Sequence, residues 1–141
     1  MTMLAVRVGP ISFAATLETE RAPQTTAAFL ARLPFEGRLV QARWSGEAGW
    51  VPLADYDLGV GYENATSHPA PGHVLWHPPG LSEAELLVPY GSACFSSRVG
   101  QLAGNHFLTI LDAGGELTEV GRRLLWDGAQ PIRFELAEPA G

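Results

Sequence analysis

The stretch LAVRVGPISFAATLE, residues 4–18, contains two strand-like runs separated by the pair Gly9-Pro10. Glycine followed by proline is typical of a tight turn between two elements. Along the second run, larger apolar residues alternate with small or polar ones, which is the pattern of a strand with one buried face. The alternating apolar residues are Phe13, Ala15 and Leu17. The stretch therefore predicts a β-hairpin with strands at 4–8 and 11–18.

Two segments predict helices, one toward each end of the chain. The first starts at Pro23, a residue suited to the first helical position, and stops before Pro34. The second follows Gly114-Gly115 and ends at Gly128. Each has apolar residues at helical spacing, so we expect one face of each helix to pack on a sheet. These residues are Thr26, Phe29, Leu30 and Leu33 in the first helix, and Leu117, Val120, Leu124 and Leu125 in the second.

The rest of the chain predicts mainly strands. We expect them at 38–53, 73–77, 93–100, 106–111 and 131–137, with a short helical turn at 82–87. Within 38–53, Gly46 and Gly49 indicate a bulge or a sharp bend. In the last strand, Ile132, Phe134 and Leu136 are expected to point inward. Many strands with only two helices predict a mostly β fold, a closed antiparallel barrel of about eight strands. Closure removes exposed strand edges, and the helices can cover the two open ends.

Length and charge favour one globular domain, residues 1–141, and exclude two classes of partner. The chain has 141 residues, a formal net charge of −6 and nine scattered basic residues. Binding to nucleic acid or to an anionic membrane needs clustered positive charge, so we expect neither. The single cysteine, Cys94, cannot form an internal disulfide. We find no leader-like or membrane-spanning apolar run and expect a cytoplasmic protein.

Several short motifs extend over most of the chain. They are APQT (22–25) ahead of Phe29 and Leu33-Pro34, ARWSGEA (42–48), Glu63-Asn64 with Thr66, Pro71-Gly72 ahead of Trp76-His77-Pro78, Tyr90-Gly91 ahead of Phe95, and Gly104-Asn105 ahead of His106-Phe107. In this order they resemble a family of uncharacterised bacterial cyclophilin-like proteins. The resemblance implies a closed antiparallel cyclophilin-like β-barrel with two helices capping the ends. It implies little about activity, so function has to be argued from a site.

Prolyl isomerases of the cyclophilin type have a sequence pattern that can be compared with this chain. They use an arginine near a Phe-x-x-Gln pattern, and later a tryptophan and a histidine. Arg43 can occupy the equivalent strand position, but the following residues, WSGE (44–47), contain neither the phenylalanine nor the glutamine. The long active-site loop of the isomerases is also missing. Prolyl isomerisation therefore stays an alternative function.

Two polar stretches are candidate ligand-binding sites. Arg43 and Glu47 lie in the expected strand 38–53, where Arg43 can bind a carboxylate or phosphate through its planar guanidinium and Glu47 can act as a base. The alternative is a structural ion pair between them. Glu63 and Asn64 lie in a polar loop, and loops on a rigid scaffold often carry function. There the alternative is turn hydrogen bonding to the local backbone.

Three more residues complete the predicted ligand site. Tyr90 can offer its hydroxyl to a ligand, Asn105 lies in a turn between strands, and His106 can act as an acid or base near neutral pH. Each has a structural alternative: a buried hydroxyl with one hydrogen bond, a residue in a left-handed turn, and a satisfied surface histidine.

A metal site and a nucleophilic cysteine are both disfavoured. His73 and His77 would share one face of a strand but lie about 13 Å apart, too far for one ion. Cys94 beside Phe95 is typical of a small buried apolar residue. We therefore expect no metal and no cofactor, and the catalytic residues, if the protein is an enzyme, remain unknown.

These candidates predict a protein that binds, and in one version transforms, a small polar or anionic molecule in a groove at the barrel mouth. The seven ligand-binding candidates are Arg43, Glu47, Glu63, Asn64, Tyr90, Asn105 and His106. One alternative is a peptide binder of the prolyl isomerase type. Another is a non-catalytic partner or oligomer module with Trp50 and Trp76 exposed at an interface. A homodimer is compatible with base rates.

Overall fold

The computed structural model describes residues 2–138, which form eleven strands and two helices. In chain order they are β1 (Met3–Val8), β2 (Ile11–Leu17), α1 (Pro23–Leu30), β3 (Phe35–Gln41), β4 (Gly46–Pro52), β5 (Ala65–Thr66), β6 (His73–His77), β7 (Glu85–Ala93), β8 (Ser96–Ser97), β9 (Gly100–Gln101), β10 (Gly104–Leu111), α2 (Leu117–Trp126) and β11 (Gln130–Leu136).

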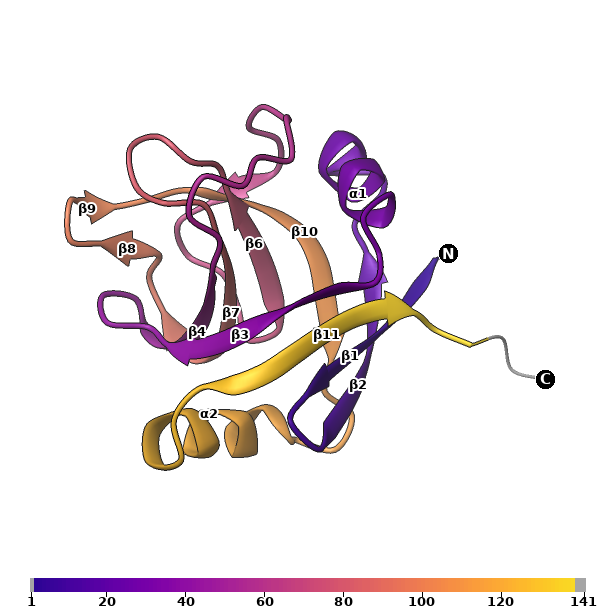
Figure 1. Ribbon diagram of the computed structural model, residues 1–141, viewed down its shortest axis with the longest axis vertical. Coiled ribbons are helices and arrows are strands. Elements are labelled where there is room, and N and C mark those ends of the chain that lie inside the picture. Colours follow the sequence, from indigo (N-terminus) through magenta and orange to yellow (C-terminus); the bar gives the residue numbers. More distant parts are fainter. Residues whose placement is uncertain (1, 139–141) are drawn as a thin grey trace.

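Eight of the strands in the described range close into one barrel. Their order around it is β2-β1-β11-β3-β4-β7-β6-β10, and β10 pairs with β2 to complete the circle. Every pairing is antiparallel. The helices α1 and α2 lie at opposite ends of the barrel (Figure 1). The prediction of a mostly β, closed antiparallel barrel with two helices at its ends is therefore confirmed.

The N-terminal hairpin forms as predicted. β1 and β2 pair with Val8 opposite Ile11, so Gly9-Pro10 makes the turn. Gly9 has φ +55°, a left-handed conformation that glycine adopts without a steric penalty, and its N–H donates to the carbonyl oxygen of Pro131. The turn is thereby attached to β11, the neighbour of β1 in the barrel.

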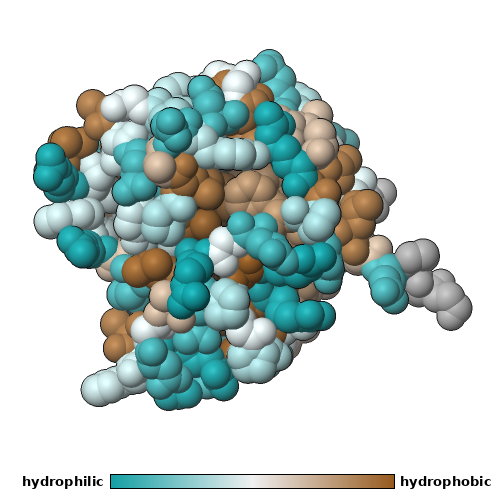
Figure 2. All heavy atoms as spheres, in the orientation of Figure 1, coloured by the Kyte–Doolittle hydropathy of each residue, from teal (hydrophilic) through white to brown (hydrophobic). Residues whose placement is uncertain are grey.

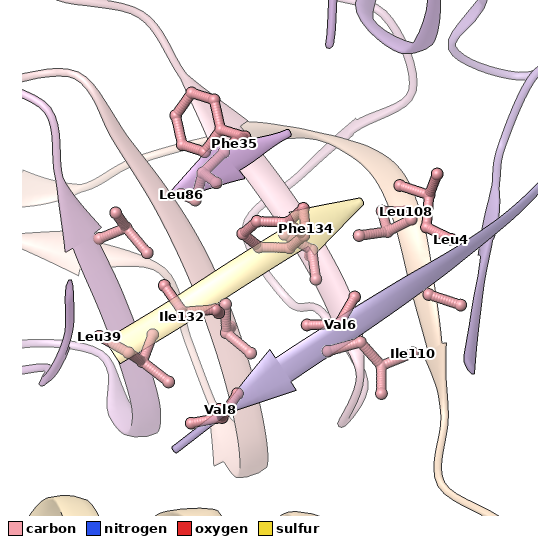
Figure 3. Packing of buried hydrophobic residues seen from close by; sticks show 14 of the residues in the cluster. Leu4, Val6, Val8, Phe35, Leu39, Leu86, Leu108, Ile110, Ile132 and Phe134 are labelled. Atoms are coloured by element: carbon pink, nitrogen blue, oxygen red, sulfur yellow. The ribbon is translucent and has the colours of Figure 1, made fainter. Parts of the chain in front are cut away.

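Alternate residues of the strands fill the barrel interior. Figure 3 shows side chains from β1, β3, β7, β10 and β11 converging there. From one end, Phe29 of α1 packs its ring against Phe35, Phe107 and Phe134, with centroid distances of 5.2, 4.9 and 5.3 Å. Burying each such ring contributes about 2 kcal/mol, so α1 is held chiefly by this aromatic cluster.

At the other end, α2 packs through Leu117, Val120 and Leu124. Leu125, which the apolar pattern placed on the same stripe, is exposed, and so is Leu136 at the end of β11. Both residues lie near the end of their element, where the side chain no longer reaches the core even though the apolar periodicity continues. Figure 2 shows hydrophilic residues over much of the face seen in Figure 1, with smaller hydrophobic areas between them.

The strand predicted at 38–53 is wrong as a single element. It is two strands, β3 and β4, joined by the loop 42–45. Gly46 at the end of this loop has φ +94°, and a Cβ there would lie 2.9 Å from the Ser92 carbonyl oxygen, so the chain can turn sharply against β7. Arg43 therefore lies in a loop and not on a strand.

The helical turn predicted at 82–87 is also wrong, because Glu85 begins the nine-residue strand β7. Both faces of β7 are covered: Leu86 and Val88 point into the barrel, while Leu87 packs outside against Phe95. A strand buried on both faces has no apolar–polar alternation to reveal it. The strand predicted at 93–100 is instead the end of β7 followed by the small β8–β9 hairpin.

Trp76 corrects the expectation of an exposed aromatic interface. It is only 1% exposed and belongs to the barrel core, while Trp50 is half-buried on the outer side of β4. Within residues 2–138, neither helix has the length and apolar character needed to span a membrane.

Candidate functional site

A cavity of about 530 Å³ lies against the outer face of the barrel at β4 and β7, and we call it the wall cavity. Its walls are the loop 42–45, the segment 81–83 ahead of β7, and the residues of the β8–β9 hairpin at 96–99. In Figure 1 this hairpin stands out from the barrel beside β4 and β7. The volume is within the range of small-molecule sites in proteins.

Strand alternation places the floor of the wall cavity. On β4, Val51 points into the core, so its neighbour Trp50 points out. On β7, Leu86 points into the core, so its neighbour Glu85 points out, on the same face of the sheet as Trp50. Trp50 and Glu85 both line the cavity. The barrel core thus fixes two side chains of the candidate site.

Ser45 fastens two walls of the cavity together. Its buried hydroxyl donates to the carbonyl oxygen of Ser96 at 3.1 Å and accepts from the Ser96 N–H at 3.0 Å. Its own carbonyl oxygen accepts from the N–H of Cys94 at 3.0 Å. The loop that carries Arg43 is therefore anchored to the segment that leads into the β8–β9 hairpin.

Glu85 is the buried carboxyl group of the cavity. The residue is 6% exposed, and burial, with the negative charge of Glu83 as a smaller cause, raises its pKa to about 8. At neutral pH this side chain is therefore mostly a neutral acid that can donate a hydrogen bond.

His77 lies next to Glu85 across the β6–β7 pairing. Its ring meets Phe95 edge to face, with centroids 5.7 Å apart, and its Nδ1 is buried without a hydrogen-bond partner in the described residues. Burial lowers the pKa of His77, although a backbone hydrogen bond at Glu83 partly opposes the shift. The imidazole is therefore neutral at pH 7, which leaves an uncharged His–Glu pair behind the cavity.

Two arginines supply the positive charge around the cavity. Arg43 comes from the loop 42–45 and Arg98 from the turn of the β8–β9 hairpin. Both are exposed, and within residues 2–138 neither forms an ion pair. The lining also includes the acidic residue Glu83, whose carboxylate accepts a hydrogen bond from the Ala54 N–H at 3.2 Å. Two guanidinium groups thus face one ionised carboxylate.

Apolar side chains complete the lining. Trp44 is 56% exposed, and Leu81 and Val99 are also exposed large apolar residues at the cavity. Exposed apolar side chains gathered at one cavity indicate a binding surface more strongly than scattered ones do. The wall cavity can therefore accept a molecule with an anionic group and a flat apolar part.

The structure brings two of the other predicted residues, Glu63 and Asn105, together with Thr25 at the start of α1, in a group that we call the α1 anchor. Glu63 accepts hydrogen bonds from the N–H and the hydroxyl of Thr25 at 2.7 and 2.8 Å. The Asn105 amide donates to Thr25 Oγ1 at 3.1 Å and to the Gly61 carbonyl oxygen at 2.9 Å, and its Oδ1 accepts from the Glu63 N–H at 3.1 Å. Every one of these polar groups has a partner, and the carboxylate caps the helix.

Asn64 lies next to this anchor. It adopts φ +49°, and its amide donates to the His106 carbonyl oxygen at 2.9 Å. Asparagine tolerates the left-handed conformation better than most residues. Asn64 thus shapes the loop that carries Glu63.

His106 lies in a separate polar group on the outer side of β10. Its Nε2 is 2.9 Å from the Thr109 hydroxyl, which donates to Glu18 at 2.7 Å, and its ring stacks on His73 with centroids 4.2 Å apart. Burial, followed by the nearby His73, lowers the pKa of His106, while Glu18 acts in the opposite direction. Within residues 2–138 no three His, Cys, Asp or Glu side chains are arranged to hold a metal ion.

Glu47 and Tyr90 lie apart from the wall cavity. Glu47 accepts from the Ser92 N–H at 2.9 Å and lies against Gly91. The Tyr90 hydroxyl donates to Gln41 at 2.7 Å, and burial raises the pKa of Tyr90. Its ring packs on Gly121 of α2, where a Cβ would lie 2.2 Å from the ring. Cys94, expected to be buried, is half-buried.

Of the seven predicted ligand-binding residues, only Arg43 lines the wall cavity. Sequence reasoning missed Glu85, Arg98 and the cavity role of Trp50. The available signal for Glu85 was a charged residue at the start of the apolar run LLV (86–88). A carboxyl group there indicates either an element boundary or a buried acid. Because 82–87 was interpreted as a helical turn, Glu85 was not recognised as a candidate site residue.

Solved structures include proteins with a similar fold. One is described as McbB in complex with tryptophan; it has a TM-score of 0.68 and 20% sequence identity, and the match covers 98% of this chain but 46% of that one. This chain therefore spans about half the length of that relative. Another is the solution structure of the hypothetical protein AF2241 from Archaeoglobus fulgidus, with a TM-score of 0.55, 18% identity, and coverage of 96% and 95%.

Among curated proteins, none matches the sequence. One family model does, and it is described as "Protein of unknown function (DUF3830)". It matches residues 4–136, from the first barrel strand to the last. The chain therefore belongs to the DUF3830 family, whose function is unknown.

Proposed function

We propose that this protein binds a small aromatic carboxylate in the wall cavity. The proposal rests on Arg43 and Arg98, which have no ion pair in the part of the chain that the structure describes and lie beside a cavity floored by Trp50. Guanidinium groups bind carboxylates through charge-assisted, frequently bidentate hydrogen bonds. Tryptophan rings offer a large flat surface for an aromatic group.

The charge balance of the cavity supports an anionic ligand. At neutral pH Glu85 is mostly uncharged, because its pKa is about 8, so two arginines face only the Glu83 carboxylate. A locally positive cavity on a chain of net charge −6 attracts an anion to one place.

The apolar lining supports an aromatic group on that anion. Trp44, Leu81 and Val99 leave large apolar surfaces exposed around the opening. A small inorganic anion would leave these surfaces in water, whereas an aromatic ring would cover them.

The similar structure of McbB in complex with tryptophan suggests a probe. Tryptophan carries both a carboxylate and an aromatic ring. At 20% identity that likeness concerns the fold, so it guides the choice of ligand and the binding site is argued from the residues above.

We also infer that the barrel is of the cyclophilin-like type. The inference rests on the chain order of a hairpin, a helix, a run of strands, a second helix and a closing strand. Prolyl isomerisation is the competing activity for such a barrel. A protease-coupled peptide assay in which this protein accelerates isomerisation, and in which an aromatic carboxylate does not inhibit it, would favour that activity.

Isothermal titration calorimetry with benzoylformate and L-tryptophan tests the proposal. Benzoylformate has a carboxylate on an aromatic skeleton, and its methyl ester has the same skeleton without the charge. We expect at least one of the two acids to bind and the ester to bind at least tenfold more weakly. Replacing both arginines (Arg43→Ala with Arg98→Ala) should weaken binding about 30-fold, because two charge-assisted contacts are lost.

Arg38→Ala is the matched control, since Arg38 is an exposed arginine on β3 outside the cavity lining. It should leave the affinity unchanged. Absence of binding by both acids, or equal losses in the control and the double variant, would refute the proposed function.

A further inference from the structure

Glu85 has hydrogen-bonding capacity that the fold leaves unused. The residue is 94% buried, yet it lines the wall cavity. Burial and the charge of Glu83 are the causes of its shifted pKa, and no hydrogen-bond donor within residues 2–138 offsets them. Buried polar groups nearly always have a partner. Since Glu85 lines the wall cavity, its free hydrogen-bonding capacity is available to a molecule bound there.

The groups that face Glu85 favour its uncharged form. Glu83 precedes it and is negatively charged. His77, across the β6–β7 pairing, is neutral because burial lowers its pKa. Arg43 and Arg98 on the walls form no ion pair with Glu85 in the described range. In the described range, no arginine side chain of the cavity therefore stabilises the ionised form of Glu85 through an ion pair.

Resting on the function proposed above, we propose that the protonated Glu85 carboxyl donates a hydrogen bond to an uncharged carbonyl oxygen of the bound molecule, so that the preferred ligand is an aromatic oxo acid and not an amino acid. The arginines on the walls hold the carboxylate of the ligand, and Glu85 on the floor holds its carbonyl group. An ammonium group at the same point would lose its hydration, and a neutral carboxyl group would offer it only an uncharged acceptor and no ion pair unless Glu85 gave up its proton.

The pH dependence of benzoylformate binding tests this assignment. Binding to the protonated form alone should weaken about tenfold between pH 7 and pH 9, since the protonated fraction of a group with pKa about 8 falls by that factor. Calorimetry at the two pH values measures it, with a thermal melt at each pH to verify that the protein is folded. L-phenylglycine, which has an ammonium group in place of the carbonyl, should bind at least tenfold more weakly than benzoylformate at pH 7.

The variant Glu85→Gln separates Glu85 from other titrating groups. Its amide can still donate a hydrogen bond but does not titrate, so affinity at pH 7 should stay within about threefold of the wild type. Its change between pH 7 and pH 9 should be less than twofold. A tenfold decrease in this variant would show that another group is responsible and overturn the assignment.

Two further outcomes distinguish this inference from the proposed function. If benzoylformate binds equally well or more tightly at pH 9, or if L-phenylglycine binds better than benzoylformate at pH 7, the inference fails while aromatic carboxylate binding stands. If neither benzoylformate nor L-tryptophan binds at either pH, both proposals fail.

Discussion

The α1 anchor and the wall cavity are both polar clusters built around a carboxyl group, but they differ in how the fold uses their polar atoms. In the anchor, Glu63 accepts hydrogen bonds from Thr25, and Asn105 makes three hydrogen bonds while only 2% exposed. In the cavity, Glu85 has no protein donor to stabilise its charge within residues 2–138, and the arginines nearby have no ion pair.

This difference separates a structural cluster from a candidate binding site. Polar groups that satisfy one another inside the fold contribute to stability and have no capacity left for a ligand. Groups that the fold positions and leaves unpaired cost stability, and a ligand can recover that cost. Substitutions in the two clusters should therefore have opposite effects on the free energy of unfolding and on ligand affinity.

The largest effect is expected from Glu85→Gln as a function of pH. The pKa of Glu85 is about 8 in the folded protein and near 4.5 when unfolded, so between these values unfolding releases a proton. Rising pH therefore favours unfolding, by up to about 1.4 kcal/mol per pH unit, and the wild type loses about 3.5 kcal/mol between pH 5 and pH 8 through this group. The glutamine variant lacks the effect, so its stability relative to the wild type should increase by that amount.

Urea denaturation of both proteins at pH 5 and pH 8 measures the change. Glu83→Gln is the matched control, because Glu83 is an exposed carboxylate two positions away and should change the difference by less than about 1 kcal/mol. A stability difference between Glu85→Gln and the wild type that is the same at both pH values would show that Glu85 ionises normally in the fold.

The second effect concerns the α1 anchor. Asn105→Ala removes three hydrogen bonds and leaves the Gly61 carbonyl oxygen and the Glu63 N–H without their partner, so it should cost about 3 kcal/mol of unfolding free energy. Benzoylformate affinity should not change, because Asn105 does not line the wall cavity. Chemical denaturation and calorimetry measure the two effects.

Asn64→Gly is the comparison within the same loop. It removes one hydrogen bond, but glycine fits the left-handed backbone at this position, so the net cost should be below about 1 kcal/mol. If Asn105→Ala abolished ligand binding while leaving stability intact, the anchor would be the ligand site.

Sequence predicted best those strands that have one buried face and one solvent-exposed face, because such strands show apolar–polar alternation. The hairpin of β1 and β2 alternates clearly and was predicted nearly to its ends. β7 is covered on both sides, by the core inside and Phe95 outside, so its run LLV (86–88) carries no alternation. Gly46 indicated a bend, but the contact of Gly46 with β7, which accompanies the break into two strands, joins segments distant in the sequence.

The candidate site was harder to predict for a related reason. Sequence identified stretches dense in polar residues, and these include Arg43 in the wall cavity and Glu63 in the anchor. It could not tell which polar groups would find partners, because those partners are distant in the chain: Glu63 meets Thr25 across 38 positions. Glu85 and Arg98 lie in different segments of the sequence, and only the fold brings them to one cavity.

A smaller effect is expected at Ser45, which lines the wall cavity and also makes structural hydrogen bonds to Ser96. Ser45→Ala leaves the N–H and carbonyl oxygen of Ser96 without their partner and should cost about 1.5 kcal/mol of unfolding free energy. Because the loop of Arg43 is then less well held, benzoylformate should bind about threefold more weakly. Ser92→Ala, at an exposed serine nearby, should change neither quantity.

The smallest effect on stability is expected at Trp44, which lines the wall cavity and should affect ligand binding much more than stability. Its side chain is 56% exposed, so Trp44→Ala should change the unfolding free energy by less than about 0.5 kcal/mol. It should nevertheless weaken benzoylformate binding about threefold, because a flat surface at the cavity opening is lost. Trp126→Ala is the control, since Trp126 is 80% exposed on α2 and lies outside the cavity lining.

For this comparison to hold, Asn105→Ala has to lower stability without changing affinity, and Trp44→Ala has to lower affinity without changing stability. Replacing a residue that serves only the fold lowers the free energy of unfolding, whereas replacing a residue that serves only ligand binding lowers the affinity. If Trp44→Ala and Trp126→Ala gave the same affinity, the exposed rings would be ordinary surface residues. The aromatic part of the proposed ligand would then have no support from the opening of the cavity, and recognition would rest on Trp50, the arginines and Glu85.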